Sequence, residues 1–238
     1  TLADAEVPAS AALAYEAQEQ LIDLIDSPLV GWKVGATGPA SQTKLGVKTP
    51  IYGPVFQRTL IESGHDVPLS DFHHQPGLES EFAFTIGVTL RPGGAAMNAR
   101  SAKEIVSTVH TAIELVCSRF DRNFDVDPAL LVADGALHAA LTVGPGKEPA
   151  EVRDLSTHRL RTVVNNQEIA TGTGQEVLGD PYESLAWLCN HLNRRQLTLA
   201  AGSIVTTGAA TGLHTTEVGQ ILTTDGGTLG SASLNLVA

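Results

Sequence analysis

Two glutamates, Glu79 and Glu81, stand two positions apart in an apolar, strand-like run between Gly77 and Gly87. Because successive side chains of a strand point to opposite faces, the two carboxylates share one face and Ser80 takes the other. Neighbouring carboxylates in apolar surroundings repel each other and resist loss of water, and a buried divalent cation removes both penalties. The pair therefore predicts a metal site. The competing interpretation is an exposed sheet face, on which alternating glutamates are ordinary.

A third glutamate, Glu114, lies in a similar apolar run between Thr111 and Cys117. An ionised side chain in that setting needs a partner. Three carboxylates on adjoining strands would form an all-oxygen site, and such ligands suit Mg²⁺, Mn²⁺ or Ca²⁺ better than Zn²⁺.

A lysine flanked by glycines, Lys33, lies in the strand-like segment from Val30 to Gly35. Glycines at positions 31 and 35 allow backbone or ligand to approach closely. A buried lysine near a metal can have a lowered pKa and act as an acid or base. The alternative is an exposed strand lysine, which is common.

Other polar residues admit two interpretations each. Asp134 either begins a plain turn with Gly135 or places a carboxylate at the mouth of a site. His138 follows closely, and the pair His73-His74 precedes the glutamate pair. Each histidine is either a solvated loop residue or a group that serves a metal or substrate.

Two families of motif are absent. The glycines around Gly172 and Gly174 match neither the dinucleotide-binding pattern, which needs a glycine where Val177 stands, nor the P-loop. No Gly-x-Ser-x-Gly occurs, so a hydrolase nucleophile elbow is not indicated.

The elements that must position these residues are predicted to be short strands with few helices, which is typical of an α+β fold. One helix is predicted over 10–26, with Ser10 as its cap and an apolar stripe, and another over 181–194, with Asp180 as its cap. The stripe of the first helix is Leu13, Ala17, Leu21, Leu24 and Ile25. Further expectations are a helix at 101–112, a hairpin at 159–170 around Asn165-Asn166, and strands at 30–34, 79–90, 112–117, 139–143, 203–207, 219–224 and 231–237.

The chain as a whole has 238 residues, 42% of them hydrophobic, and a net charge of −11. The acidic balance argues against nucleic acid, which needs clustered Lys and Arg. Two cysteines and no bilayer-spanning run favour a cytoplasmic protein without a membrane partner. No linker or repeat interrupts the sequence. We expect one catalytic domain over 1–238, with a helical segment at 1–28 and a β-rich metal-binding core at 29–238.

Several short motifs, in their order along the chain, resemble the 2-keto-4-pentenoate hydratase and 4-oxalocrotonate decarboxylase group of the fumarylacetoacetate hydrolase superfamily. The resemblance runs from about residue 13 to the C-terminus. It is carried by Gly31–Thr37, Leu45–Val47, Pro50, Tyr52–Pro54, Glu79–Phe84, Ile113–Leu115, Ser118-Arg119, Gly172–Pro181, Trp187-Leu188 and Leu199–Gly208.

This resemblance implies a mixed β-roll with flanking helices and a homo-oligomer. It implies Mg²⁺ or Mn²⁺ held by Glu79, Glu81 and Glu114. It further implies Lys33 and Asp134 as catalytic residues. The substrate contacts that it implies are Gly35, Thr37, Leu45 and Gly208. The segment from Asp134 to His138 departs from the group, because the usual Asn after the Asp is Gly135 here and Leu137-His138 replace small serines.

Substrates of this group are short 2-oxo or 2-hydroxydienoic acids. The resemblance implies hydration of a 2-hydroxypenta-2,4-dienoate to a 4-hydroxy-2-oxo acid in aromatic catabolism. Alternatives are decarboxylation of a 4-oxalocrotonate-type acid and hydrolysis of a C–C bond in an acylpyruvate, for which His73 or His74 would activate water with a glutamate. A metal-binding homologue without turnover is the non-enzymatic alternative.

Overall fold

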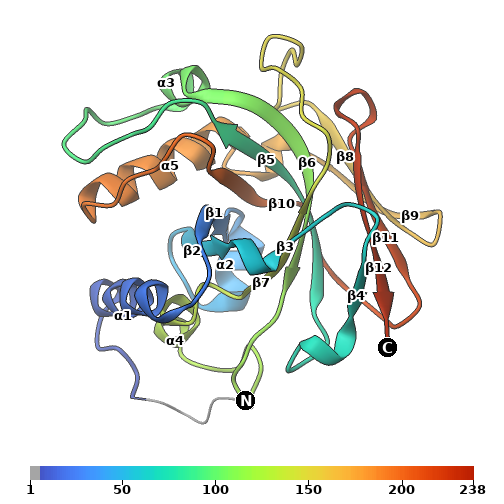
Figure 1. Cartoon of the computed structure of the whole chain (residues 1–238), viewed down its shortest axis with the longest axis horizontal. Helices are drawn as coiled ribbons and strands as arrows, with labels where there is room; N and C mark the ends of the chain where they lie inside the picture. Colours follow the sequence, from blue (N-terminus) through green and yellow to red (C-terminus); the bar gives the residue numbers. More distant parts are fainter. Residues whose placement is uncertain (1–5) are drawn as a thin grey trace.

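Two β-sheets form the framework of the protein in the computed structural model, which describes residues 6–238 (Figure 1). The seven-stranded sheet has the order β2-β1-β10-β5-β6-β7-β3, and the five-stranded sheet has the order β4-β12-β11-β8-β9. The strands of the first sheet are β1 (Leu29–Gly35), β2 (Ile51–Phe56), β3 (Leu60–Ile61), β5 (Gly77–Ile86), β6 (Val106–Val116), β7 (His138–Val143) and β10 (Ile204–Thr215). Those of the second are β4 (Asp66–Pro68), β8 (Arg159–Val164), β9 (Gln167–Thr173), β11 (Ile221–Asp225) and β12 (Ser231–Val237).

Helices flank the larger sheet on the side away from the five-stranded sheet (Figure 1). They are α1 (Ala11–Leu24), α2 (Pro39–Leu45), α3 (Ala99–Glu104), α4 (Pro128–Ala133) and α5 (Pro181–Arg194). Helix α1 packs beside α4, and α5 contacts both α3 and β10. This arrangement confirms the α+β expectation. Within residues 6–238, no helix has the length and apolarity needed to cross a bilayer.

The layer between the two sheets shows which face of β5 is turned inward. Ser80 Oγ lies 2.8 Å from Thr162 Oγ1 on β8 and accepts a hydrogen bond of 2.7 Å from Thr224 Oγ1 on β11. Apolar side chains surround this polar contact, among them Leu78, Ile113, Leu115, Leu222 and Leu234. Ser80 therefore faces the second sheet, and the glutamates on either side of it face the helices, as the alternation predicts.

Local signals in the sequence locate several elements correctly. The backbone N–H of Leu13 donates to Ser10 Oγ at 3.3 Å at the start of α1, and that of Tyr182 donates to Asp180 Oδ1 at 2.8 Å at the start of α5. The turn between β8 and β9 places Asn165 and Asn166 at φ of 49° and 65°. Two positive φ values are what a two-residue hairpin of type I′ requires.

Two predictions of secondary structure are wrong. The helix expected over 101–112 ends at Glu104, and β6 begins at Val106 because this β-branched stretch pairs along β5. The stripe expected on α1 is not its buried face, since Leu13 and Leu24 are 46% and 81% exposed. Gln18 is buried instead, and its amide donates to two backbone carbonyls. Helices α2 and α4 were not expected.

Candidate active site

Three carboxylates converge on the helix-facing side of the larger sheet. Glu79 on β5 pairs directly with Glu114 on β6, and Glu81 follows on the same face of β5. One oxygen from each lies within 4.8 Å of the others. Glu81 and Glu114 are both 0% exposed. The alternative of a solvent-exposed sheet face therefore does not hold.

A bulge in β10 orients Glu81. The register of β10 against β5 shifts between Thr206 and Ala209, and there the N–H of Gly208 donates to Glu81 Oε2 at 2.7 Å. Gly208 has a φ of 106°, and a Cβ at this position would lie 2.4 Å from Thr37 Oγ1. Only glycine suits this backbone conformation and this close approach.

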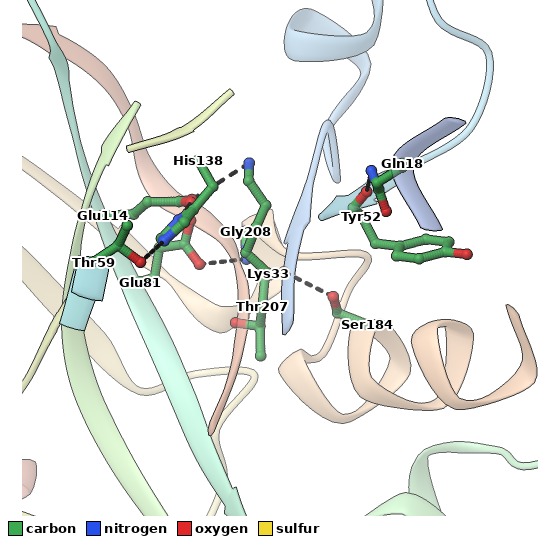
Figure 2. A network of polar contacts seen from close by, with 10 residues as sticks. All are labelled: Gln18, Lys33, Tyr52, Thr59, Glu81, Glu114, His138, Ser184, Thr207 and Gly208. Carbon is green, nitrogen blue, oxygen red and sulfur yellow. Dashed lines mark hydrogen bonds and ion pairs between the residues drawn. The ribbon is translucent and has the colours of Figure 1, made fainter. Parts of the chain in front are cut away.

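Helix α5 holds the bulge in place (Figure 2). Ser184 Oγ donates to the carbonyl of Thr207 at 2.8 Å. Thr207 Oγ1 donates to the carbonyl of Phe82 on β5 at 3.1 Å. The peptide between Thr207 and Gly208, whose N–H binds Glu81, is thereby held through its carbonyl by a helix, and the Thr207 side chain ties it to a strand.

The second ligand-like carboxylate, Glu114, is oriented by a histidine (Figure 2). His138 Nδ1 lies 2.7 Å from Glu114 Oε1, and its Nε2 lies 2.9 Å from Thr59 Oγ1. Because an ionised carboxylate only accepts hydrogen bonds, Nδ1 carries the proton in this contact. The imidazole thus occupies Oε1 and leaves Oε2 of Glu114 free to face the other carboxylates.

The ammonium of Lys33 approaches the same cluster from β1. Lys33 is 2% exposed, and its Nζ lies 3.5 Å from Glu114 Oε2. A Cβ at Gly35 would lie 2.9 Å from this Nζ, and one at Gly31 would lie 2.0 Å from the carbonyl oxygen of Ile204. The glycines on both sides of Lys33 therefore serve the close approach that the sequence predicts, and the exposed-lysine alternative is wrong.

Burial and mutual repulsion set the protonation of the cluster. Burial raises the pKa of Glu79 to about 7 and that of Glu81 well above its ordinary value. Burial also acts to raise the pKa of Glu114, but Lys33 and His138 hold this pKa below its ordinary value. Burial acts to lower the pKa of Lys33, yet the carboxylates, Glu114 first, raise it overall. In the metal-free protein Lys33 is therefore an ammonium.

The donor set fits a divalent cation. Glu81 Oε1 and Glu114 Oε2 are buried, and neither has a hydrogen-bond partner among residues 6–238. Buried polar atoms are almost always paired in native proteins, so two unpaired carboxylate oxygens within one acidic cluster call for a ligand. A hard cation with a preference for oxygen satisfies both atoms and replaces the protons that burial would otherwise impose.

A cavity of about 470 Å³ opens beside the cluster. Lys33 and Glu79 line it, together with Gly35, Thr37 and Leu45. Three of the four substrate contacts implied by the resemblance thus share one cavity wall. The fourth, Gly208, contacts Glu81 instead. Helix α2, which the sequence did not reveal, brings Leu45 to this wall.

Asp134 lies elsewhere. It is the C-cap of α4, forms an ion pair with Arg119, and lines a second cavity of about 380 Å³ together with His73 and Arg58. It is not among the residues that line the Lys33 cavity. Asp134 and Lys33 thus line different cavities, and His138 lines the second one together with Asp134.

The histidines divide in a similar way. His74 Nε2 lies 2.6 Å from the carbonyl of Phe120, and His73 lies in the second cavity. The histidine that pairs with a glutamate is His138, which the sequence gives no stronger signal than the others. Thr59, its second partner, carries no sequence signal, because a short turn after β2 places it there.

Comparison with known families gives one match over most of the chain. The family model described as fumarylacetoacetate (FAA) hydrolase C-terminal matches residues 34–233. The chain belongs to this family. Among its relatives, the 2-keto-4-pentenoate hydratase of Burkholderia vietnamiensis is 34% identical over 206 residues, which cover 84% of this chain and 76% of the relative. The 4-oxalocrotonate decarboxylase of Pseudomonas sp. strain CF600 is 33% identical and covers 77% of this chain and 68% of its own.

Solved structures of the family share the fold. The 4-oxalocrotonate decarboxylase of Pseudomonas putida G7, complexed with magnesium and adipate, aligns with a TM-score of 0.88 at 29% identity, covering 96% of this chain and 86% of that one. A fumarylpyruvate hydrolase from Pseudomonas aeruginosa aligns over 89% of this chain and 91% of its own with a TM-score of 0.66, but at 16% identity it supports the fold alone.

Substituting Gly208 tests the role of the bulge. In Gly208→Ala, the added Cβ would meet Thr37 at 2.4 Å, so the peptide that binds Glu81 must move. We expect magnesium affinity to fall at least about tenfold, as when outer partners of metal ligands are removed. Isothermal titration calorimetry measures this change. The control is Gly212→Ala, also at positive φ but with open space around it. Equal losses in the two variants would contradict the role assigned to the bulge.

The raised pKa of Glu79 predicts how metal binding depends on pH. In the folded, metal-free protein this carboxyl keeps its proton up to about pH 7, against 4.5 for an ordinary glutamate. The stability that this proton contributes is present below pH 4.5 and is lost as the pH rises through 7. We therefore expect the increase in melting temperature caused by Mg²⁺ to grow between pH 5 and about 7.5.

The difference between melting curves with and without Mg²⁺ at each pH measures this effect, because titration of groups remote from the site cancels. In Glu79→Gln, the increase in melting temperature caused by Mg²⁺ should grow less between pH 5 and about 7.5. An increment that is constant across this range would show that metal binding displaces no proton from the cluster.

Proposed function

We propose that the protein is a divalent-metal-dependent lyase that hydrates a short 2-hydroxydienoic acid to a 4-hydroxy-2-oxo acid. The observation that carries this proposal is the convergence of Glu79, Glu81 and Glu114 beside a cavity into which Lys33 also reaches. The relatives named as 2-keto-4-pentenoate hydratases support the reaction class. We further propose that the protein is cytoplasmic and homo-oligomeric, in keeping with its two free, buried cysteines and with the resemblance to its group.

The three glutamates would hold the cation, for which we propose Mg²⁺, with Mn²⁺ as a possible substitute. When bound, the cation supplies Lewis-acid stabilisation of negative charge on the oxygen next to the acid carboxylate of the substrate. Gly208 and His138 keep Glu81 and Glu114 in the orientation that the cation needs.

Lys33 carries the proton. Its buried ammonium lines the cavity 3.5 Å from Glu114 Oε2, and in the metal-free protein the carboxylates raise its pKa. In this proposal Nζ donates a proton to C5 of the dienol and recovers one from the C2 hydroxyl as the ketone forms. Water then adds at C4, and a proton is delivered to C3, so that one molecule of water is consumed. We assign no step to Asp134, because it is paired with Arg119 in the second cavity.

Decarboxylation of a 2-oxo-enedioate is the second candidate. The relatives named as 4-oxalocrotonate decarboxylases and the structural likeness to one of them favour it. Both reactions place negative charge on the same oxygen, so the acidic cluster and Lys33 serve either one. Hydrolysis of an acylpyruvate is less well supported. Neither His73 nor His74 pairs with a glutamate of the cluster.

Two assays with magnesium separate these reactions. The dienol absorbance of 2-hydroxypenta-2,4-dienoate is followed with the protein, and CO₂ is measured with 4-oxalocrotonate. Loss of dienol without CO₂ supports hydration, and CO₂ from the diacid supports decarboxylation. A chelator should stop either reaction. No turnover of either acid by the metal-loaded protein would overturn the proposed lyase in favour of a binding protein or of another acylpyruvate reaction.

Lys33→Ala tests the proton carrier. Removal of the ammonium should lower turnover by about 10² or more, the usual contribution of a general acid, while Mg²⁺ still binds through the three carboxylates. Steady-state kinetics and calorimetry measure the two effects. Lys48→Ala is the control, since Lys48 is exposed and lies outside the residues that line the cavity. Retained turnover in Lys33→Ala would remove this residue from the mechanism.

A further inference from the structure

The cavity beside the acidic cluster contains a second lysine that the proposed reaction does not use. Lys44 comes from the last turn of α2 and lines this cavity together with Lys33 and Glu79. Lys44 is exposed, whereas Lys33 is almost completely buried. The two cations therefore differ in depth, with Lys33 at the acidic cluster and Lys44 toward solvent.

The ammonium of Lys33 is already paired with the acidic cluster. Its Nζ lies 3.5 Å from Glu114 Oε2, and the other two carboxylates act on it as well. Lys44, in contrast, takes part in no ion pair among residues 6–238. It is the cation of this cavity that remains available to a bound anion.

An aromatic ring positions the Lys44 ammonium. Nζ lies 5.9 Å from the centroid of the Phe124 ring, and Phe124 itself lines the cavity. A cation over the face of a ring is held by the ring quadrupole without being neutralised.

The rest of the lining explains why one cation at this place would matter. Apart from the two lysines, the charged residues of the lining are Glu79, which belongs to the cluster, and Glu176, which is exposed. Most of the other side chains are small or apolar, among them Leu45, Ile51, Val116, Leu137 and Leu213. A substrate anchored at the cluster by one carboxylate would extend through apolar surroundings toward Lys44.

We propose that Lys44 recognises a second carboxylate at the far end of the substrate, so that the protein prefers short 2-oxo dicarboxylic acids to the monocarboxylic acids of equal length. This inference rests on the proposed function, because it takes the first carboxylate to lie at the acidic cluster. If the protein is a hydratase, its substrate would then be a 2-hydroxydienedioic acid in place of the five-carbon 2-hydroxypenta-2,4-dienoate. Glu176, the exposed acidic residue of the same lining, repels the second carboxylate and limits the preference.

Two unreactive ligands test the proposal with the magnesium-loaded full chain. 2-Oxoadipate and 2-oxohexanoate have six carbons each and differ only in the terminal carboxylate. We expect calorimetry to show about five- to tenfold tighter binding of the diacid, the range for a charged contact that is partly exposed to solvent. In Lys44→Met the preference should vanish through loss of diacid affinity, with binding of 2-oxohexanoate unchanged.

Further variants separate a specific role from general electrostatics. Lys44→Arg should restore the preference, and Glu176→Gln should increase it. Lys48→Met removes the same charge from an exposed lysine four positions along the chain, outside the cavity lining, and should leave the preference as it is. A loss of preference in Lys48→Met equal to that in Lys44→Met would overturn the proposal, because net charge would then account for it.

The outcomes also distinguish this inference from the proposed function. If both acids bind with equal affinity, or if Lys44→Met keeps the preference, Lys44 does not recognise a second carboxylate, while the 2-oxo acid site stands. If neither acid binds to the magnesium-loaded protein, the proposed function fails and the assignment to Lys44 fails with it.

Discussion

Burial of three carboxylates at one place on a sheet is the constraint on which the rest of this structure depends. Like charges directly opposite each other on paired strands destabilise a sheet, and Glu79 and Glu114 are such a pair. Removal from water adds to this cost, as the raised pKa values of Glu79 and Glu81 show. The arrangement is balanced by the buried ammonium of Lys33 and fits a cation that the unpaired oxygens can bind.

The scaffold holds Glu81 and Glu114 by different contacts. The bulge in β10 directs a backbone N–H at Glu81, a hydrogen bond from α5 holds the carbonyl of the same peptide, and the Thr207 side chain bonds to β5. A histidine ring with both nitrogens engaged holds Glu114. These contacts leave Glu81 Oε1 and Glu114 Oε2 without a hydrogen bond, which is how a site can be rigid and still able to bind a ligand.

The cavity wall shows local backbone strain. Ala36, Ala136 and Leu137 line the cavity and have φ values of 54°, 56° and 70°. Side chains other than glycine rarely adopt this conformation, and it persists where surrounding structure imposes it. The segment after α4 thus lines the cavity with Ala136 and Leu137, while Asp134 at its start pairs with Arg119. This is the segment in which the chain departs from the group it resembles.

The sequence by itself determined the features that depend on neighbouring residues. Alternation in β5 placed Glu79 and Glu81 on one face, and side-chain caps and paired asparagines marked the starts of two helices and one hairpin. The order of motifs along the chain determined the family. Local patterns failed where strand pairing over long sequence distances competes with helix propensity. The residues from Val106, expected in a helix, pair with β5 as part of β6.

Only the tertiary structure decided which of the polar residues act together. Lys33 reaches Glu114 because β1 and β6 lie in one sheet, with β10 and β5 between them. His138 contacts Glu114 of the acidic cluster, whereas Asp134, four positions earlier, pairs with Arg119. The physical reason is that the energy of a buried charge depends on what surrounds it in space. Strand order, a bulge and a helix cap set those surroundings, and no local pattern encodes them.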